Sequence, residues 1–144
     1  MNIHATAVAL GSFGILIEGP SGSGKTALAL AAVEYLQAQG QFAALVADDQ
    51  CLVEAVNHRF IASCPPALTG LVEMHGLGII KHKTLGSVIV DIVIRLIEHS
   101  DLDRMPEAKT TMISGFELPA FELPARQIAI SLPLLYQIIA NRRF

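Results

Sequence analysis

The sequence GPSGSGKT at residues 19–26 matches the pattern G-x-x-x-x-G-K-[ST] at every fixed position. It consists of Gly19, Pro20, Ser21, Gly22, Ser23, Gly24, Lys25 and Thr26. Glycines let the backbone wrap around an anion with its N–H groups turned inward, and the lysine adds a mobile cation for the outer phosphates. The threonine hydroxyl is a hard oxygen ligand for Mg²⁺. The motif therefore predicts binding of a nucleoside triphosphate or pyrophosphate with Mg²⁺, without identifying the acceptor of a phosphoryl group.

The segments on both sides of this loop fit the same prediction. Residues 15–18 are apolar enough for a short strand that leads into the loop, and residues 26–39 have apolar side chains near helical spacing. Gly40 is placed to end that helix. Because a helix N-terminus carries partial positive charge, a loop between a strand and a helix suits an anion. A glycine-rich turn that matches by chance is the alternative, and this context disfavours it.

Farther from the loop, the pattern predicts a small α/β domain. Residues 3–10 are expected to form a strand that turns back at residues 11–14, and residues 42–47 a buried strand. Further strands are expected at residues 51–56, 60–62, 71–74 and 88–97, a loop at 74–80, an extended segment at 117–123 and a helix at 126–143. The competing prediction for 88–97 is a helix with Asp91 and Arg95 paired at i,i+4. The helix at 126–143 requires Pro133 in its first turn, with Ser131 as the cap.

Two adjacent carboxylates, Asp48 and Asp49, follow the strand predicted at residues 42–47. One of them can hold Mg²⁺ or its waters, and the other can accept a proton from an incoming hydroxyl. A turn or a helix cap is the alternative, because aspartate is common in both. Since the chain also has a phosphate loop, we favour the functional interpretation.

A second unusual segment is EMHGLGII at residues 73–80. Its Glu73 is followed by two glycines among residues typical of strands, which indicates backbone close to a ligand. A plain hairpin loop fits the same residues equally well.

Composition limits the class of protein. The chain has 144 residues, of which 52% are hydrophobic and 16% charged, so a disordered tail is excluded and a single domain over residues 1–144 is expected. Mean hydropathy is +0.51, yet no apolar run reaches the roughly 20 residues of a spanning helix. We therefore expect no membrane partner. The surplus of apolar residues predicts a subunit interface and thus a homo-oligomer.

The net charge and the two cysteines indicate which partners and which cellular compartment to expect. Net charge is −3 and the ten basic residues are scattered, which argues against nucleic acid as the main partner. Cys51 and Cys64 have neither zinc-site spacing nor the number of a disulfide scaffold, so they fit reduced thiols. The N-terminus lacks a secretory pattern. These features predict a cytoplasmic protein.

Taken in order, the pieces resemble a known family. His4, the turn at 11–14, GPSGSGKT at 19–26, VADD at 46–49 and EMHGLGII at 73–80 resemble the catalytic domain of HPr kinase/phosphorylase, whose signature is EIRGLGII. The resemblance covers residues 4 to about 126. It implies a mixed-sheet P-loop kinase domain of the type shared with phosphoenolpyruvate carboxykinase. It also implies no N-terminal regulatory domain, as in the short forms of some proteobacteria.

The resemblance further implies an activity and partners. It implies an ATP-dependent protein serine kinase that phosphorylates HPr, the small carrier protein of the sugar phosphotransferase system. Pyrophosphate and inorganic phosphate are implied as alternative ligands, the latter in the reverse reaction. The family is hexameric, which fits the apolar surplus.

Roles carry over at matching positions. The resemblance implies that residues 19–26 hold the phosphates with Lys25 catalytic, and that Thr26 and Glu73 bind Mg²⁺. Of the aspartates, we favour Asp49 as the general base, with Asp48 beside it to orient it. His4 and Arg104, the latter in a DR pair, match an active-site histidine and an essential arginine. The arginine could stabilise charge on the moving phosphoryl group.

The chain departs from the family pattern in places. His75 stands where the signature has arginine, and the helix after the loop is a few residues longer. LPARQ at residues 123–127 replaces RPGRN, a segment tied to dephosphorylation, so the kinase reaction is better supported than the phosphorylase reaction. Two other functions stay open: a P-loop small-molecule kinase and a non-catalytic nucleotide-binding switch. Whether phosphate reaches a protein acceptor distinguishes them.

Overall fold

Short strands and two longer helices make up the structure, a computed structural model that describes residues 1–141. The strands are β1 (Asn2–Ile3), β2 (Thr6–Leu10), β3 (Phe13–Glu18), β4 (Ala43–Ala47), β5 (Cys51–Val56), β6 (Arg59–Ser63), β7 (Leu71–Met74), β8 (Gly78–Lys81), β9 (Ser87–Ile89), β10 (Ile92–Ile97), β11 (Lys109–Ile113) and β12 (Phe116–Pro124). The helices are α1 (Lys25–Ala38) and α2 (Ile128–Asn141), with short 3-10 turns at Pro66–Leu68 and His99–Asp101. Neither α1 nor α2 is long and apolar enough to cross a membrane, and no other helix within residues 1–141 is.

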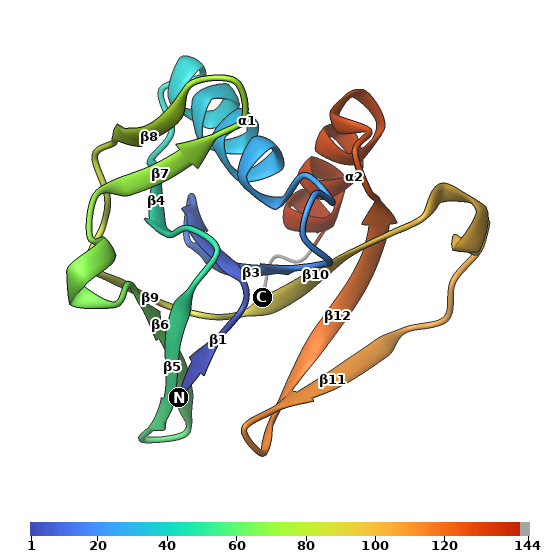
Figure 1. The fold of residues 1–144 in the computed structure, drawn as a ribbon. Coiled ribbons are helices and arrows are strands. Elements are labelled where there is room, and N and C mark those ends of the chain that lie inside the picture. Colours follow the sequence, from blue (N-terminus) through green and yellow to red (C-terminus); the bar gives the residue numbers. More distant parts are fainter. Residues whose placement is uncertain (142–144) are drawn as a thin grey trace.

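A six-stranded mixed sheet lies at the centre, in the order β11-β12-β10-β3-β2-β4. Helices α1 and α2 pack on one face of this sheet, and the antiparallel sheet β1-β5-β6-β9 lies on the other side (Figure 1). The hairpin β7–β8 lies beside α1. The fold is thus a mixed α/β sandwich, as expected.

Two apolar cores separate these layers because alternate residues of a strand face opposite sides of the sheet. In β3, Ile15 and Ile17 face the helices, whereas Leu16 between them faces the second sheet. The helix-side core continues with Leu28, Val33 and Leu36 of α1, Leu135 of α2 and Val72 of β7. The second core contains Val46, Cys51, Val53, Phe60, Val93 and Leu118.

Strand directions bring several strand ends to one edge of the central sheet. β10 is parallel to both β3 and β12, and β4 runs the same way because β2 is antiparallel to β3 and to β4. The carboxyl ends of β3, β4, β10 and β12 therefore lie at the same edge. Ligands of open α/β sheets bind outside such an edge.

Several expected elements are confirmed. The strands predicted at 51–56 and 71–74 have those bounds, and the predicted hairpin joins β2 to β3. The helix predicted at 26–39 begins and ends one residue earlier, as α1. The extended segment at 117–123 is β12.

The strand predicted at residues 3–10 is instead divided between two sheets. Asn2–Ile3 pairs with β5, whereas Thr6–Leu10 pairs with β3 and β4. His4 and Ala5 connect the two sheets. The exposed His4 stands at the break, but one polar residue in an otherwise apolar run does not by itself predict that the two parts pair in different sheets.

Two other predictions need correction. Residues 74–80 are not merely a loop, since Gly78–Lys81 pairs with β7 to form a hairpin. The segment 88–97 is extended, so the helical alternative is wrong, but it splits into β9 and β10 at Val90 and Asp91. Asp91 makes two hydrogen bonds to the backbone of Gly14 in β3. Its main-chain N–H donates to the Gly14 carbonyl, and its carboxylate accepts from the Gly14 N–H.

The C-terminal helix also starts differently from the prediction. It begins at Ile128, so Pro133 is its sixth residue rather than part of the first turn. Ser131 is inside the helix and is no cap; its buried hydroxyl donates a hydrogen bond to the Pro124 carbonyl at 2.6 Å. The predicted continuation through Arg142 and Arg143 lies outside the described residues.

Candidate active site

The phosphate loop joins β3 to α1 at the shared edge of the sheet. Gly22 and Gly24 have left-handed backbones, with φ of +80° and +93°, and Gly24 is the residue that caps α1. A Cβ on Gly19 would lie 2.5 Å from the Ser23 hydroxyl oxygen. Glycine at these positions is therefore required by the backbone and by close packing, not only by a ligand.

Lys25 holds its charge inside this loop. Its side chain is only 6% exposed, and Nζ donates hydrogen bonds to the Gly19 and Pro20 carbonyls at 2.8 and 3.1 Å. Because Lys25 is the first residue of α1, the cation and the positive end of the helix dipole act at the same place. This arrangement attracts an anion.

Asp48 ties three segments of the chain together. Its Oδ1 accepts hydrogen bonds from the hydroxyls of Thr26 at 2.5 Å and Thr6 at 3.4 Å, and its Oδ2 accepts from the Glu73 backbone N–H at 3.2 Å. A carboxylate has about four acceptor positions, so these three donors occupy most of them. The bonds bring α1, β2 and β7 to the end of β4.

Asp49 points in another direction. Its φ is +68°, in the left-handed region, which aspartate enters more readily than most residues with a side chain. Its carboxylate pairs with Nε2 of His4, and its side chain is 56% exposed. Asp49 is therefore the carboxylate of the pair that an incoming molecule can reach.

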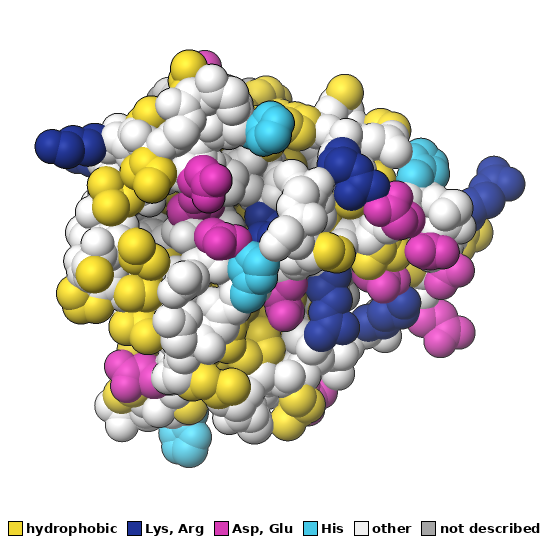
Figure 2. All heavy atoms as spheres, in the orientation of Figure 1, with side chains coloured by type: hydrophobic (Ala, Val, Ile, Leu, Met, Phe, Trp, Pro, Cys, Tyr) yellow, Lys and Arg dark blue, Asp and Glu magenta, His cyan; other side chains and the backbone are white. Residues whose placement is uncertain are grey.

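One cavity collects most of the predicted site residues. It has a volume of about 670 Å³ and is lined by Ser21, Gly22, Gly24, Lys25, Thr26, Ala27, Leu30, Asp48, Asp49, Glu73, Met74 and His75. Figure 2 shows acidic, basic and histidine side chains gathered across this face of the molecule. His75, which departs from the family signature, lies in the same lining as Glu73.

The oxygen donors of this cavity fit Mg²⁺. The Thr26 hydroxyl gives its proton to Asp48, which leaves its lone pairs free for a cation, and Glu73 adds a carboxylate to the same cavity. Within residues 1–141, no group of three or more His, Cys, Asp or Glu side chains is arranged to hold a metal. Mg²⁺ at phosphoryl-transfer sites usually takes one or two carboxylates and completes its shell with phosphate and water oxygens.

Five predicted site residues are not in this lining: His4, Gly19, Pro20, Ser23 and Arg104. His4 pairs with Asp49, and Gly19, Pro20 and Ser23 belong to the loop, so Arg104 is the one of these five without such a link. It is exposed, in the segment between the 3-10 turn His99–Asp101 and β11. In the part of the chain that the structure describes, its side chain makes no hydrogen bond or ion pair. Its role stays a prediction.

Two residues outside the predicted set also contact the site, and the second of them, Arg126, lies in the LPARQ segment that the sequence analysis had already noted. Thr6 contacts both aspartates, through the Asp48 carboxylate and the Asp49 backbone N–H, and no sequence signal marks it. Arg126, at the end of β12, donates its backbone N–H to the Ser23 carbonyl at 2.9 Å, and its side chain pairs with Glu98. The parallel direction of β12 and β3 would have placed Arg126 here, had the pairing been known.

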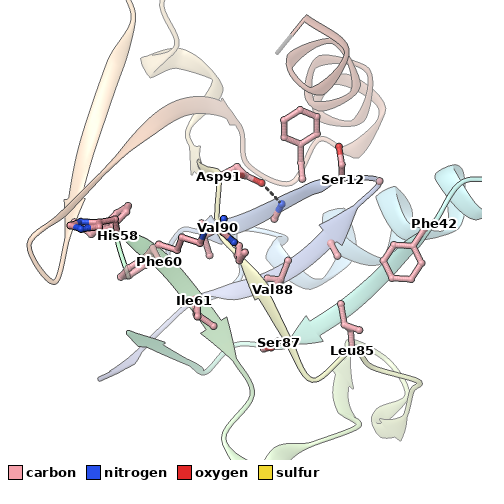
Figure 3. Close-up of a pocket in the computed structure, with 17 residues that line it drawn as sticks. Ser12, Phe42, His58, Phe60, Ile61, Leu85, Ser87, Val88, Val90 and Asp91 are labelled. Atoms are coloured by element: carbon pink, nitrogen blue, oxygen red, sulfur yellow. Dashed lines mark hydrogen bonds between the residues drawn. The ribbon is translucent and has the colours of Figure 1, made fainter. Parts of the chain in front are cut away.

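A larger cavity of about 780 Å³ lies elsewhere. It is bounded by the β2–β3 turn, the β5–β6 turn and β9. This is the edge of the central sheet at which β3 and β10 begin. Figure 3 shows Phe42, Phe60 and Val88 around it, with the Asp91 carboxylate at one side. One Asp91 oxygen already accepts the Gly14 N–H at 2.8 Å. The smaller cavity has the glycine-rich loop and Lys25, so it is the candidate site for phosphate.

Comparisons with known proteins agree on one family. The family model described as HPr Serine kinase C-terminal domain matches residues 1–142. The HPr kinase/phosphorylase of Mycoplasmopsis pulmonis is 30% identical over 139 residues, and that of Clostridium beijerinckii is 32% identical over 135 residues. These alignments cover 88% and 86% of this chain but only 43% of each relative, so the chain spans less than half the length of these relatives.

A solved structure has the same fold. The Hpr(Ser) kinase/phosphatase from Coxiella burnetii matches with a TM-score of 0.83 and 24% identity. The match covers 99% of this chain and 90% of the other. At this identity the likeness shows the fold alone.

Proposed function

Since this chain belongs to the HPr serine kinase C-terminal domain family, we propose that it is a protein serine kinase that transfers the γ-phosphoryl group of ATP to HPr. The observation that carries the proposal is one cavity lined by Lys25, Thr26, Asp48, Asp49 and Glu73. These side chains provide a cation for phosphates, oxygen ligands for Mg²⁺ and an accessible base. Phosphoryl transfer needs all three.

The loop and Lys25 bind the phosphates in this proposal. Lys25 exchanges its bonds to the Gly19 and Pro20 carbonyls for phosphate oxygens, and the free N–H groups at the start of α1 add further donors. Thr26 and Glu73 would hold Mg²⁺, which when bound neutralises charge on the outer phosphates. Asp48 keeps the Thr26 hydroxyl turned toward that ion.

Asp49 is the base in this proposal. It accepts the proton of the serine hydroxyl while that oxygen attacks the γ-phosphorus, and the bond from the γ-phosphorus to the bridging oxygen breaks to release ADP. His4 holds the Asp49 carboxylate in place. Asp48 is less suited to this step because three donors already occupy its oxygens. We assign to Arg104 the role of stabilising the negative charge on the transferred phosphoryl group. Arg104 reaches that group only if the exposed segment before β11 brings it to the cavity.

The forward reaction is the main one in this proposal. The relatives' names include a phosphorylase activity, but this chain has LPARQ at residues 123–127. Inorganic phosphate or pyrophosphate would bind at the same loop.

We also propose a cytoplasmic homo-oligomer, a hexamer by resemblance. Exposed apolar side chains support an assembly: Leu77 and Ile79 of the β7–β8 hairpin are 74% and 71% exposed, and Met105 is 91% exposed. Light scattering of the purified chain tests it, and a monomer at all concentrations would contradict it.

The decisive experiment is the intact mass of purified HPr after incubation with this chain and Mg-ATP. We expect one added phosphoryl group, none with the Lys25→Ala variant, and none on an HPr whose acceptor serine is replaced by alanine. Unmodified HPr, with ATP binding still detectable, would overturn the proposal and favour a small-molecule kinase or a nucleotide-binding switch. Removal of the phosphate on adding inorganic phosphate would show that the reverse reaction is retained.

A further inference from the structure

Thr6 is a fully buried polar residue between the two aspartates. It begins β2, its side chain is 0% exposed, and its neighbours in β2 are apolar. Its hydroxyl accepts a hydrogen bond from the Asp49 backbone N–H at 3.2 Å and donates one to Asp48 Oδ1 at 3.4 Å. A threonine hydroxyl has one hydrogen and two lone pairs, so both bonds can exist together.

The backbone that Thr6 holds is irregular. The pairing of β2 with β4 steps from Val8↔Leu45 to Ala7↔Ala47, so Val46 is an extra residue in β4. Such a bulge bends a strand and redirects the side chains after it. Asp49 follows with a left-handed backbone, a conformation that persists only where surrounding groups hold it. The Thr6 hydroxyl is such a group.

This geometry makes the two carboxylates diverge. Asp48 points to Thr26 on the metal-binding side, and Asp49 points to His4 on the open side. If Asp49 had an ordinary strand backbone, its side chain would take a different direction from this one. A single hydroxyl therefore contacts the carboxylate of Asp48 and the backbone of Asp49, the two residues whose side-chain directions the reaction needs.

We propose that Thr6 is a positioning residue for phosphoryl transfer, which sets the direction of Asp49 through its backbone and steadies Asp48. The inference rests on the proposed function, because it assigns the consequence of that geometry to turnover. The inference goes beyond the proposed function because it requires a hydroxyl, rather than any buried side chain, at residue 6.

The test compares two variants of the full chain. Thr6→Val keeps the shape and removes the hydroxyl, whereas Thr6→Ser keeps the hydroxyl and removes the methyl group. Hydrogen exchange of the Asp49 amide, followed by NMR, measures the Asp49 bond without any acceptor protein. We expect exchange to be about tenfold faster or more in Thr6→Val, and within about threefold of the unmodified chain in Thr6→Ser.

Turnover should follow the same pattern. In Thr6→Val we expect kcat for HPr phosphorylation to fall about 10–100-fold, because a small misplacement of a reacting group has effects of this size. The Kd for Mg-ATP should stay within about twofold, since the loop and Lys25 are untouched. Thr111→Val is the matched control: Thr111 is also buried and hydrogen-bonded, but to Arg95 on another part of the sheet. Its kcat should be unchanged.

Three results would overturn the inference: unchanged Asp49 exchange in Thr6→Val, an unchanged kcat in that variant, or a loss in Thr6→Ser as large as in Thr6→Val. The last would mean that packing of the methyl group matters. If the unmodified chain does not phosphorylate HPr, the proposed function fails separately. Asp49 exchange then still tests the hydroxyl, and phosphate release from Mg-ATP to water replaces HPr phosphorylation as the turnover measurement.

Discussion

The Thr26 hydroxyl donates a hydrogen bond of 2.5 Å to Asp48 Oδ1, which joins the first turn of α1 to the end of β4. The bond settles which aspartate belongs to which side of the site. Asp48 is committed to the threonine of the phosphate loop, and Asp49 remains exposed beside His4. The Thr6 hydroxyl bonds both the Asp48 carboxylate and the Asp49 backbone N–H. That Asp48 helps to orient Asp49 stays a prediction.

The two aspartates should give different defects when each is changed to asparagine. Asp48→Asn removes the charge that accepts the Thr26 proton, and a hydrogen bond to a charged group contributes about 1.5–3 kcal/mol, so Mg-ATP affinity should fall by about 10–100-fold. Asp49→Asn should leave affinity nearly unchanged and lower turnover by about 10²–10⁴-fold, because it removes a general base. A fluorescent nucleotide measures affinity and HPr phosphorylation measures turnover. The opposite assignment of the two defects would make Asp48 the base.

Replacing Arg104 should affect chemistry without affecting stability. Its side chain makes no bond within residues 1–141, so Arg104→Ala should change the free energy of unfolding by less than about 0.5 kcal/mol. If it meets the transferred group, kcat should fall by about 10²–10³-fold. Arg59→Ala, an exposed arginine beside the larger cavity, is the control and should keep full turnover. Equal turnover in both variants would remove Arg104 from the site.

Gly14 of β3 packs directly against the backbone of Ile89 in β9, a strand of the other sheet. A Cβ there would lie 1.8 Å from the Ile89 carbonyl oxygen, a backbone atom that cannot move aside alone. Gly14→Ala should therefore lower the free energy of unfolding by about 3 kcal/mol or more. At Gly86 a Cβ meets nothing within 4 Å, and Gly86→Ala should stay within about 1 kcal/mol. Urea unfolding measures both, and similar midpoints would contradict the close contact.

Cys51 should be unreactive in the folded protein. Burial disfavours the thiolate and raises the pKa of Cys51 from 9.0 to about 12. Only the thiolate attacks disulfide reagents, so at pH 8 about 10⁻⁴ of Cys51 is reactive, and the rate should rise about tenfold per pH unit. Ellman's reagent on a Cys64→Ser variant measures this rate, and urea provides the unfolded control. Rapid labelling at pH 8 without urea would contradict the burial.

Local patterns were sufficient for the phosphate loop and its flanks. Gly22 and Gly24 need left-handed backbones, a lysine must follow them, and the helix begins there. These requirements lie within one short stretch, so the motif showed them. The strand bounds at 51–56 and 71–74 were also predicted, because alternation and turn residues act over a few positions.

Breaks inside apolar runs were not predictable in this way. Residues 3–10 and 88–97 are each divided between two sheets, with His4 and Asp91 at the two breaks, but a single polar residue does not show that the flanking strands join different sheets. The division depends on which partner strand each half finds. The predicted start of the C-terminal helix was wrong because it relied on Ser131 as a cap. The Ser131 hydroxyl instead donates a hydrogen bond to the Pro124 carbonyl, a contact outside the helix that the local sequence does not show.

The sequence by itself predicted a phosphate-binding loop at residues 19–26 and placed two carboxylates after a buried strand, because backbone geometry and hydrophobic alternation are short-range properties. Only the tertiary structure decided that His4 reaches Asp49, that Asp48 reaches Thr26 and Glu73, and that Arg104 stays outside. Contacts between residues so far apart in the chain follow from strand order and from the burial of two cores. Those depend on the whole chain packing at once, which no local pattern contains.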